Sequence, residues 1–130
     1  MQALTAAVAL LGRVLLSLIF VYEGVTSIGR YSAVAEYMQG AGVDSRLLPL
    51  VILLQLGGGL MVLTGFWARL GALGLAGFCA LTAMLFHANW ADSSEMIQSQ
   101  KDLAMAGGFL MLAAFGPGAL SLDQWLARRR

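Results

Sequence analysis

The sequence predicts an all-α integral membrane protein, an antiparallel bundle of four spanning helices with short interfacial helices, in a single domain over residues 1–130. Hydrophobic residues make up 59% of the chain and charged residues only 12%, whereas charged residues make up about 25% of a soluble domain. Four apolar stretches approach the length of about 20 residues that a membrane-spanning helix needs. The 16 glycines favour close packing of such helices, because small residues let backbones approach in lipid.

The charge and the counts of cysteine and histidine exclude several functions. A net charge of +1 excludes a nucleic-acid-binding protein that relies on charge. The single cysteine, Cys79, excludes an internal disulfide, a CxxC redox pair and a zinc site built from thiolates. The single histidine, His87, excludes a haem held by two histidines of one subunit. We therefore expect no metal site, and the lack of a self-contained catalytic motif favours a protein that is not itself an enzyme.

The first two predicted spans cover residues 4–28 and 47–66. The first contains two charged residues, Arg13 and Glu23, and the second has Gln55 as its one strongly polar side chain. Polar and charged groups at membrane depth are costly, so each of these side chains needs a partner or a function.

The polar segment between these spans, residues 29–46, predicts an amphipathic helix in the membrane interface, because apolar residues recur in it at helical spacing. These residues are Tyr31, Val34, Ala35 and Met38. The third span, residues 69–89, follows the second after a very short turn, so the two spans form an antiparallel hairpin. The fourth span, residues 101–116, follows a capping-box pattern at Asp92 and Glu95 and ends at a Gly-Pro-Gly sequence.

The C-terminal residues 121–130 predict a short interfacial helix, since Ser121 and Gln124 have capping-box spacing and three arginines follow. An even number of spans places both termini on one side of the membrane. That side carries five cationic residues against three on the other, which favours cytoplasmic termini. On this topology we expect five side chains to contact lipid headgroups: Arg13, Arg69, Arg128, Arg129 and Arg130.

Two stripes of mostly small residues predict the faces on which the spans pack. The stripe on the first span consists of Arg13, Ser17, Phe20, Gly24 and Ser27. The stripe on the third span consists of Arg69, Ala72, Ala76, Ala80, Ala83 and His87. We interpret both as helix-packing seams, and the alternative is a ligand groove between them.

Polar residues from all four spans are predicted to converge in the outer half of the membrane. They are Glu23, Gln55, His87, Asn89, Lys101 and Asp102. Three interpretations remain open. The first is a buried hydrogen-bonded network that orients the helices, with Glu23 paired to Lys101 or His87. The second is a polar pocket for a small ligand or a quinone headgroup, and the third is a proton path through Glu23 and His87.

A series of short segments is informative through its order and spacing. The segments are Arg13 with residues 15–20 and Gly24; Tyr37-Met38; Gly42-Val43; residues 48–59; Gly65-Phe66 and Arg69; Leu85-Phe86-His87; Lys101-Asp102-Leu103; Gly107-Gly108; Gly116-Pro117-Gly118; and Ser121-Leu122-Asp123. In this series the chain resembles the DoxX family of small four-helix membrane proteins over nearly its whole length. Two positions depart from the family, which often has Lys in place of Ser27 and Glu in place of Gln55.

The resemblance implies an inner-membrane bundle, and some members of the family are linked to sulfur-compound oxidation with quinone as the acceptor. We therefore expect a non-catalytic membrane subunit, or a small-ligand-binding protein, that works with a partner in the lipid bilayer. One alternative is the membrane subunit of a quinone-linked oxidoreductase, with quinone as its cofactor and an oxidoreductase as its partner. The other is a small-molecule transporter formed by a homo-oligomer.

Overall fold

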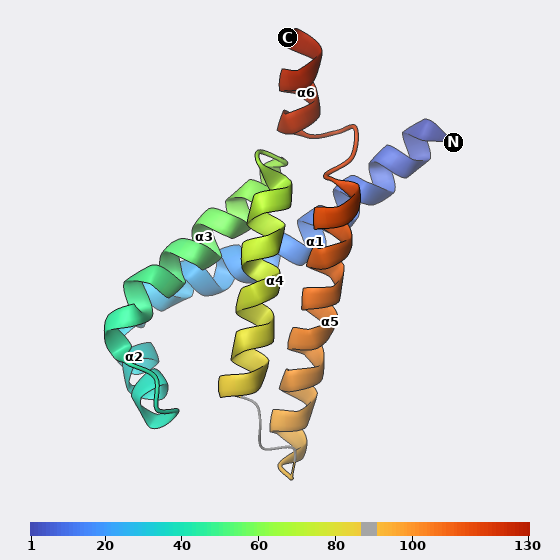
Figure 1. The fold of residues 1–130 in the computed structure, drawn as a ribbon. Helices are drawn as coiled ribbons and strands as arrows, with labels where there is room; N and C mark the ends of the chain where they lie inside the picture. Colours follow the sequence, from blue (N-terminus) through green and yellow to red (C-terminus); the bar gives the residue numbers. More distant parts are fainter. Residues whose placement is uncertain (87–90) are drawn as a thin grey trace.

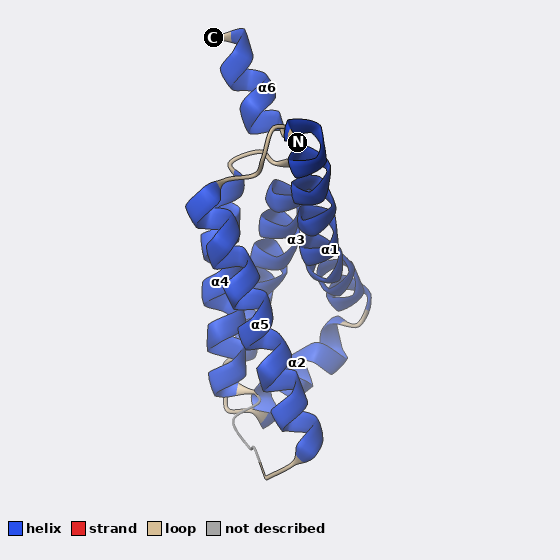
Figure 2. Ribbon diagram, turned by 90° about the vertical axis from the view of Figure 1, so that its right-hand side faces the viewer, coloured by secondary structure: helices blue, strands red, loops and turns tan. Residues whose placement is uncertain are grey.

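A computed structural model describes residues 1–86 and 91–130, and every regular element in these two ranges is helical (Figures 1 and 2). The elements are α1 (Gln2–Gly29), α2 (Tyr31–Gly40), the 3-10 turn η1 (Ser45–Leu47), α3 (Leu48–Thr64), α4 (Ala68–Leu85), α5 (Ser93–Phe115) and α6 (Leu122–Arg129). The predicted all-α class is therefore confirmed.

Three helical segments are long and apolar enough to cross a membrane: Gln2–Gly29, Ser45–Thr64 and Ala68–Leu85. The fourth predicted span, residues 101–116, is only the second half of α5, and α5 does not belong to this group. The physical reason is its polar first half, which is rich in Ser and Gln. The apolar remainder, residues 103–115, is about 20 Å long at the helical rise, shorter than the hydrocarbon core of about 30 Å.

The four long helices form two pairs that diverge from each other (Figures 1 and 2). α3 packs against α1 on one side and against α4 on the other, and α4 runs antiparallel to α5. α1 crosses α5 obliquely, so that their contact is concentrated near Phe20 and Phe109. Both chain termini lie at the same end of the molecule as the α3–α4 turn (Figure 1).

The core lies where the four helices approach most closely. Phe20 of α1 meets Phe109 of α5 edge to face, with ring centroids 5.3 Å apart, and Val62 and Leu75 pack in the same cluster. The buried residues of α1 are Arg13, Ser17, Phe20, Gly24 and Ser27, so the predicted seam on this helix is confirmed. On α4 the predicted seam holds for Ala72, Ala76 and Ala83, which are buried, whereas Arg69 is exposed.

The α3–α4 turn is tied to the chain's C-terminal segment. The carboxylate of Asp123 accepts hydrogen bonds from the backbone N–H groups of Trp67, at 2.8 Å, and Ala68, at 3.1 Å. It therefore caps the first turn of α4, as a local N-cap residue would. This contact also holds Trp67 at a positive φ of 49°, which is rare for a residue other than glycine.

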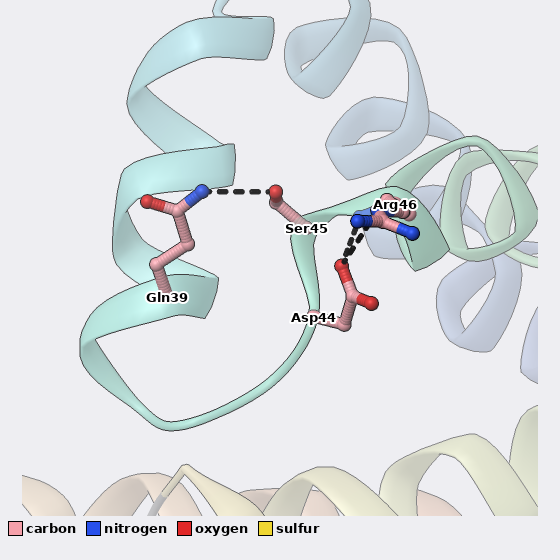
Figure 3. A network of polar contacts seen from close by, with 4 residues as sticks. All are labelled: Gln39, Asp44, Ser45 and Arg46. Carbon is pink, nitrogen blue, oxygen red and sulfur yellow. Dashed lines mark hydrogen bonds and ion pairs between the residues drawn. The ribbon is translucent and has the colours of Figure 1, made fainter.

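A helix is present in the predicted segment, as α2, with Met38 buried on its inner side. Its connection to α3 is fixed by local polar contacts (Figure 3). Gln39 Nε2 donates a 3.0 Å hydrogen bond to Ser45 Oγ, and Asp44 Oδ1 accepts a 2.9 Å bond from the backbone N–H of Arg46. Asp44 thereby caps η1 and directs the chain into α3.

The two predicted capping patterns are also present. Asp92 accepts a hydrogen bond from Ser94 N at the start of α5, and Ser121 accepts one from Gln124 N at the start of α6. α6 projects from the end of the molecule that carries both termini (Figures 1 and 2). The guanidinium of Arg129 lies 3.9 Å from the centroid of the Trp125 ring, so these two side chains of α6 form a cation–π contact.

Candidate ligand-binding site

A cavity of about 1360 Å³ lies between the α1–α3 pair and the α4–α5 pair. Its lining runs along α3 from Leu50 to Met61 and along α4 from Gly71 to Leu85. The two pairs diverge toward the end of the molecule that carries α2 (Figure 2). Side chains of α2 line the end of the cavity, among them Val34, Tyr37 and Met38. Most of the other lining residues are apolar, so the few polar groups that reach the cavity stand out.

Four of the six predicted site residues line this one cavity: Glu23 from α1, Gln55 from α3, and Lys101 and Asp102 from α5. The other two, His87 and Asn89, lie outside the described residues. The four predicted residues that the structure describes, which come from three helices, therefore lie around one cavity.

Gln55 is the most deeply placed amide of the cavity. Gln55 lies on α3 and is 9% exposed. Its Oε1 atom has no hydrogen-bond partner among the described residues. A buried acceptor without a partner loses its water without compensation, at a cost of about 1–3 kcal/mol. Because Gln55 lines the cavity, a rotation of its side chain would bring this acceptor to a bound molecule.

Ser27, like Gln55, is buried and lines the cavity. These are the two positions at which the chain departs from the residues often found in the DoxX family. Their shared location means that both departures alter the same cavity. Where the resemblance to the family implies a cation and a carboxylate, this cavity has a hydroxyl and an amide.

Sequence reasoning did not identify Thr82 and Cys79, which face the same cavity from α4. Thr82 Oγ1 lies 3.2 Å from Asp102 Oδ2 and 3.0 Å from the carbonyl oxygen of Cys79. The contact with Asp102 joins α4 to α5 and orients the carboxylate. A hydroxyl in an apolar helix is a weak signal, because such side chains commonly bond to the carbonyl one turn back.

Glu23 and Lys101 are both exposed, and they flank the cavity from α1 and α5. Within residues 1–86 and 91–130, an ion pair forms between Arg46 and Asp44, whose Nε and Oδ1 atoms are 3.9 Å apart, and none forms between Glu23 and Lys101. The Glu23–Lys101 pair expected in the network interpretation is therefore not formed in this structure. The alternative pair with His87 falls outside the described residues.

Two stacked aromatic rings lie where α2 meets the cavity. Tyr37 and Phe86 have ring centroids 5.4 Å apart and planes that differ by 12°. Burial raises the pKa of Tyr37 above its ordinary value of 10.0, and the charges of Glu95 and Asp102 raise it further. The phenol therefore stays neutral and continues to pack as an aromatic residue.

The five arginines predicted at lipid headgroups differ in their surroundings. Arg128, Arg129 and Arg130 are exposed on or beside α6, and Arg69 is exposed near Gly116. Arg13 departs from the expectation: its side chain is only 2% exposed and donates a hydrogen bond to the backbone of Leu120. The reason is the empty space at Gly65, where a Cβ atom would collide with the guanidinium of Arg13.

Comparison with known proteins gives a consistent result. The model of the DoxX family matches residues 8–88. The chain is 43% identical over 129 residues to inner membrane protein YqjF of Escherichia coli (strain K12), covering 99% of each chain. It is 30% identical over 122 residues to inner membrane protein YphA of the same organism, covering 88% of this chain and 87% of that one. No solved structure gives a significant match.

Proposed function

The chain belongs to the DoxX family, and from that premise we propose that it is a four-pass inner-membrane protein that binds a small amphipathic ligand in the cavity. We further propose that it works with a partner protein and is not itself an enzyme. The observation that carries the proposal is Gln55, which lies in the wall of a large apolar cavity and has a buried Oε1 atom with no partner within residues 1–86 and 91–130. Binding sites of small molecules combine these two features: an apolar lining and a few polar groups that fix orientation.

The fourth pass is supported by the pairing of α5 with α4. The two helices run side by side and antiparallel, so a bilayer crossed by α4 also surrounds α5 (Figure 1). The position of both termini at one end supports an even number of passes. Together with the arginines at 128–130, this favours cytoplasmic termini. Reporter fusions after residue 130 and within residues 41–44 test the orientation, because they should report opposite sides of the membrane.

The ligand we propose has a hydrogen-bond-donating head and an apolar body. The donor satisfies Gln55 Oε1, and Thr82 and Asp102 lie in the same wall as further polar contacts. Quinols belong to this chemical class because they carry two hydroxyl groups, whereas a quinone only accepts hydrogen bonds and needs donors from the protein. An apolar cavity with an amide and an ammonium group, Gln55 and Lys101, supports the alternative of a membrane subunit that binds quinone for an oxidoreductase.

Mass spectrometry of the small molecules that copurify in mild detergent tests the proposal. We expect a molecule bound in the parent protein to be lost in Gln55→Leu and in Gly57→Phe. Gly57 lines the cavity and a Cβ atom there meets nothing within 4 Å, so a side chain can leave the backbone there without a clash and occupy cavity space. Gly77→Phe on α4 is the matched control, because its Cβ atom is equally unobstructed and the residue does not line the cavity.

Equal amounts of every copurified molecule in the parent, Gln55→Leu and Gly57→Phe would overturn the binding proposal. A bound molecule that is a quinone, and is lost in the same two variants, favours the oxidoreductase subunit. Movement of a solute across sealed vesicles would instead favour a transporter.

A further inference from the structure

We propose that the ligand carries a long apolar chain and enters sideways from the bilayer, through an opening between α3 and α4. This inference rests on the proposed function, because it concerns the same cavity. It assigns the polar head of the ligand to the wall at Gln55 and Thr82. It assigns the chain to the space between Leu50 and Leu53 on α3 and Leu81 and Leu85 on α4.

The first argument is the way in which α3 and α4 separate. Near their common turn the two helices are in close contact, because a Cβ atom at Gly71 would lie 2.9 Å from the Cβ atom of Met61. A Cβ atom at Gly58 would lie 3.0 Å from Leu75. Beyond this region the helices diverge as they run away from the turn (Figure 1). In this diverging part the cavity is lined by Leu50 and Leu53 of α3 and by Leu81 and Leu85 of α4.

The second argument is the nature of the residues at that opening. Leu50, Leu53, Leu81 and Leu85 line the cavity and are at the same time exposed at the protein surface. The apolar wall of the cavity is therefore continuous with the surface of membrane-capable helices, which faces lipid. On the α1–α5 side the cavity is flanked by Glu23 and Lys101, whose charges disfavour an apolar chain.

The third argument is that α2 covers the end of the cavity. Met38 is buried there, and the Tyr37 ring stacks on Phe86 of the α4 end. A ligand arriving from water must displace this contact, whereas a ligand arriving from lipid first meets the exposed leucines of α3 and α4. The easier route for an apolar molecule is therefore the lateral one.

The size of the cavity fits a chain-bearing molecule. Its volume of about 1360 Å³ exceeds the range of about 300–1,000 Å³ found for pockets that hold drug-sized ligands. Along α3 its wall runs from Leu50 to Met61, about 16 Å at the helical rise, which is about half the hydrocarbon thickness of a bilayer. An amphiphile whose head reaches Gln55 can leave its chain in this space.

Photolabelling in a bilayer tests the inference. The probe is a monoacylglycerol with a diazirine in its acyl chain, added to vesicles of phosphatidylethanolamine and phosphatidylglycerol that contain the full chain. Its hydroxyl groups supply the hydrogen-bond donors. We expect adducts at Phe78 and Cys79, which line the cavity, in addition to adducts on the lipid-facing surface.

A matched pair of variants tests the route. Leu81→Trp places a large ring at the proposed opening, and Leu73→Trp places one elsewhere on α4; both leucines are 53% exposed, but Leu73 does not line the cavity. We expect a several-fold loss of adducts at Phe78 and Cys79 in Leu81→Trp and no loss in Leu73→Trp. Equal loss or no loss in both variants would overturn the proposed route.

The outcomes separate this inference from the proposed function. A copurified molecule that disappears in Gln55→Leu, combined with no adducts inside the cavity, would keep the binding function and overturn the lateral chain. Loss of both signals from the parent protein would overturn the two proposals together. The mass of the copurified molecule then distinguishes an acyl chain from a prenyl chain.

Discussion

The guanidinium of Arg13, on the first helix, donates a 2.5 Å hydrogen bond to the carbonyl oxygen of Leu120, which lies 107 residues later in the chain. Two more of its nitrogens, Nε and Nη1, are buried without a partner among the described residues. The side chain therefore connects α1 to the segment between α5 and α6. This segment in turn caps α4 through Asp123, so α1, the α3–α4 turn and the C-terminal segment are held as one unit.

Replacement of Arg13 by Met should loosen that unit. The loss of a buried hydrogen bond from a charged donor costs about 1.5–3 kcal/mol. We expect a lower unfolding temperature in detergent and faster proteolysis between residues 116 and 130. Arg128→Met removes an exposed arginine of α6 and serves as the control. An unchanged unfolding temperature in Arg13→Met would show that the bond to Leu120 contributes nothing to stability.

Replacement of Asp123 by Ala should destabilise the start of α4, because two backbone N–H groups lose their acceptor. The loss of a capping side chain costs about 1 kcal/mol. Because Arg13 and Asp123 hold the same segment, the double variant should lose less stability than the sum of the two single variants. Thermal unfolding of all four proteins measures the coupling, and strict additivity would contradict the single unit.

Local periodicity predicted the parts of the fold that depend on neighbouring residues. The seam of α1 follows from the spacing of five residues by three or four positions, and all five are buried. The caps at Asp92 and Ser121 follow from patterns that span four residues. The convergence of Glu23, Gln55 and Asp102 on one cavity follows from their similar depth on antiparallel helices.

Long-range contacts could not be predicted in the same way. No local pattern indicates that Arg13 turns inward to Leu120, because the space for it is created by Gly65 and by a loop 107 residues away. The role of Thr82 depends on the register between α4 and α5, which hydropathy does not define. Hydropathy alone does not decide whether α5 crosses the membrane, because only the second half of this helix is apolar.

Replacement by alanine should have opposite effects on stability at two helical glycines, Gly24 and Gly57. A Cβ atom at Gly24 would lie 2.6 Å from Leu56 Cγ, at the contact between α1 and α3, whereas one at Gly57 meets nothing within 4 Å. Overpacking costs about 1–3 kcal/mol, and alanine is favoured over glycine in a helix by about 1 kcal/mol. We expect Gly24→Ala to lower the unfolding temperature and Gly57→Ala to keep or raise it. The same response in both variants would contradict the packing of α1 on α3.

Ionisation of Tyr37 should weaken the attachment of α2 at high pH. Its pKa is raised by burial and by Glu95 and Asp102, so the folded state holds the phenol proton more tightly than the unfolded state. This stabilisation is complete below the unfolded pKa of about 10 and is lost as pH rises through the folded pKa. Phenolate absorbance should show a late-titrating component that is absent in Tyr37→Phe and shifts to lower pH in Glu95→Gln. Identical titrations of the parent and Glu95→Gln would contradict the contribution of that carboxylate.

Replacement of Gln55 by Leu should remove ligand binding while it keeps or raises the stability of the protein. Its Oε1 atom is buried without a partner in the described part of the chain, so Gln55→Leu removes an uncompensated polar group and keeps a side chain of similar length. We expect the delipidated variant to unfold at the same temperature as the parent or a higher one, because replacing an unsatisfied group by an apolar one is neutral or stabilising. Addition of the copurified molecule should then raise the unfolding temperature of the parent but not of the variant. A variant that is less stable than the parent without ligand would mean that the amide is bonded within the protein, and the polar convergence would serve helix orientation instead of binding.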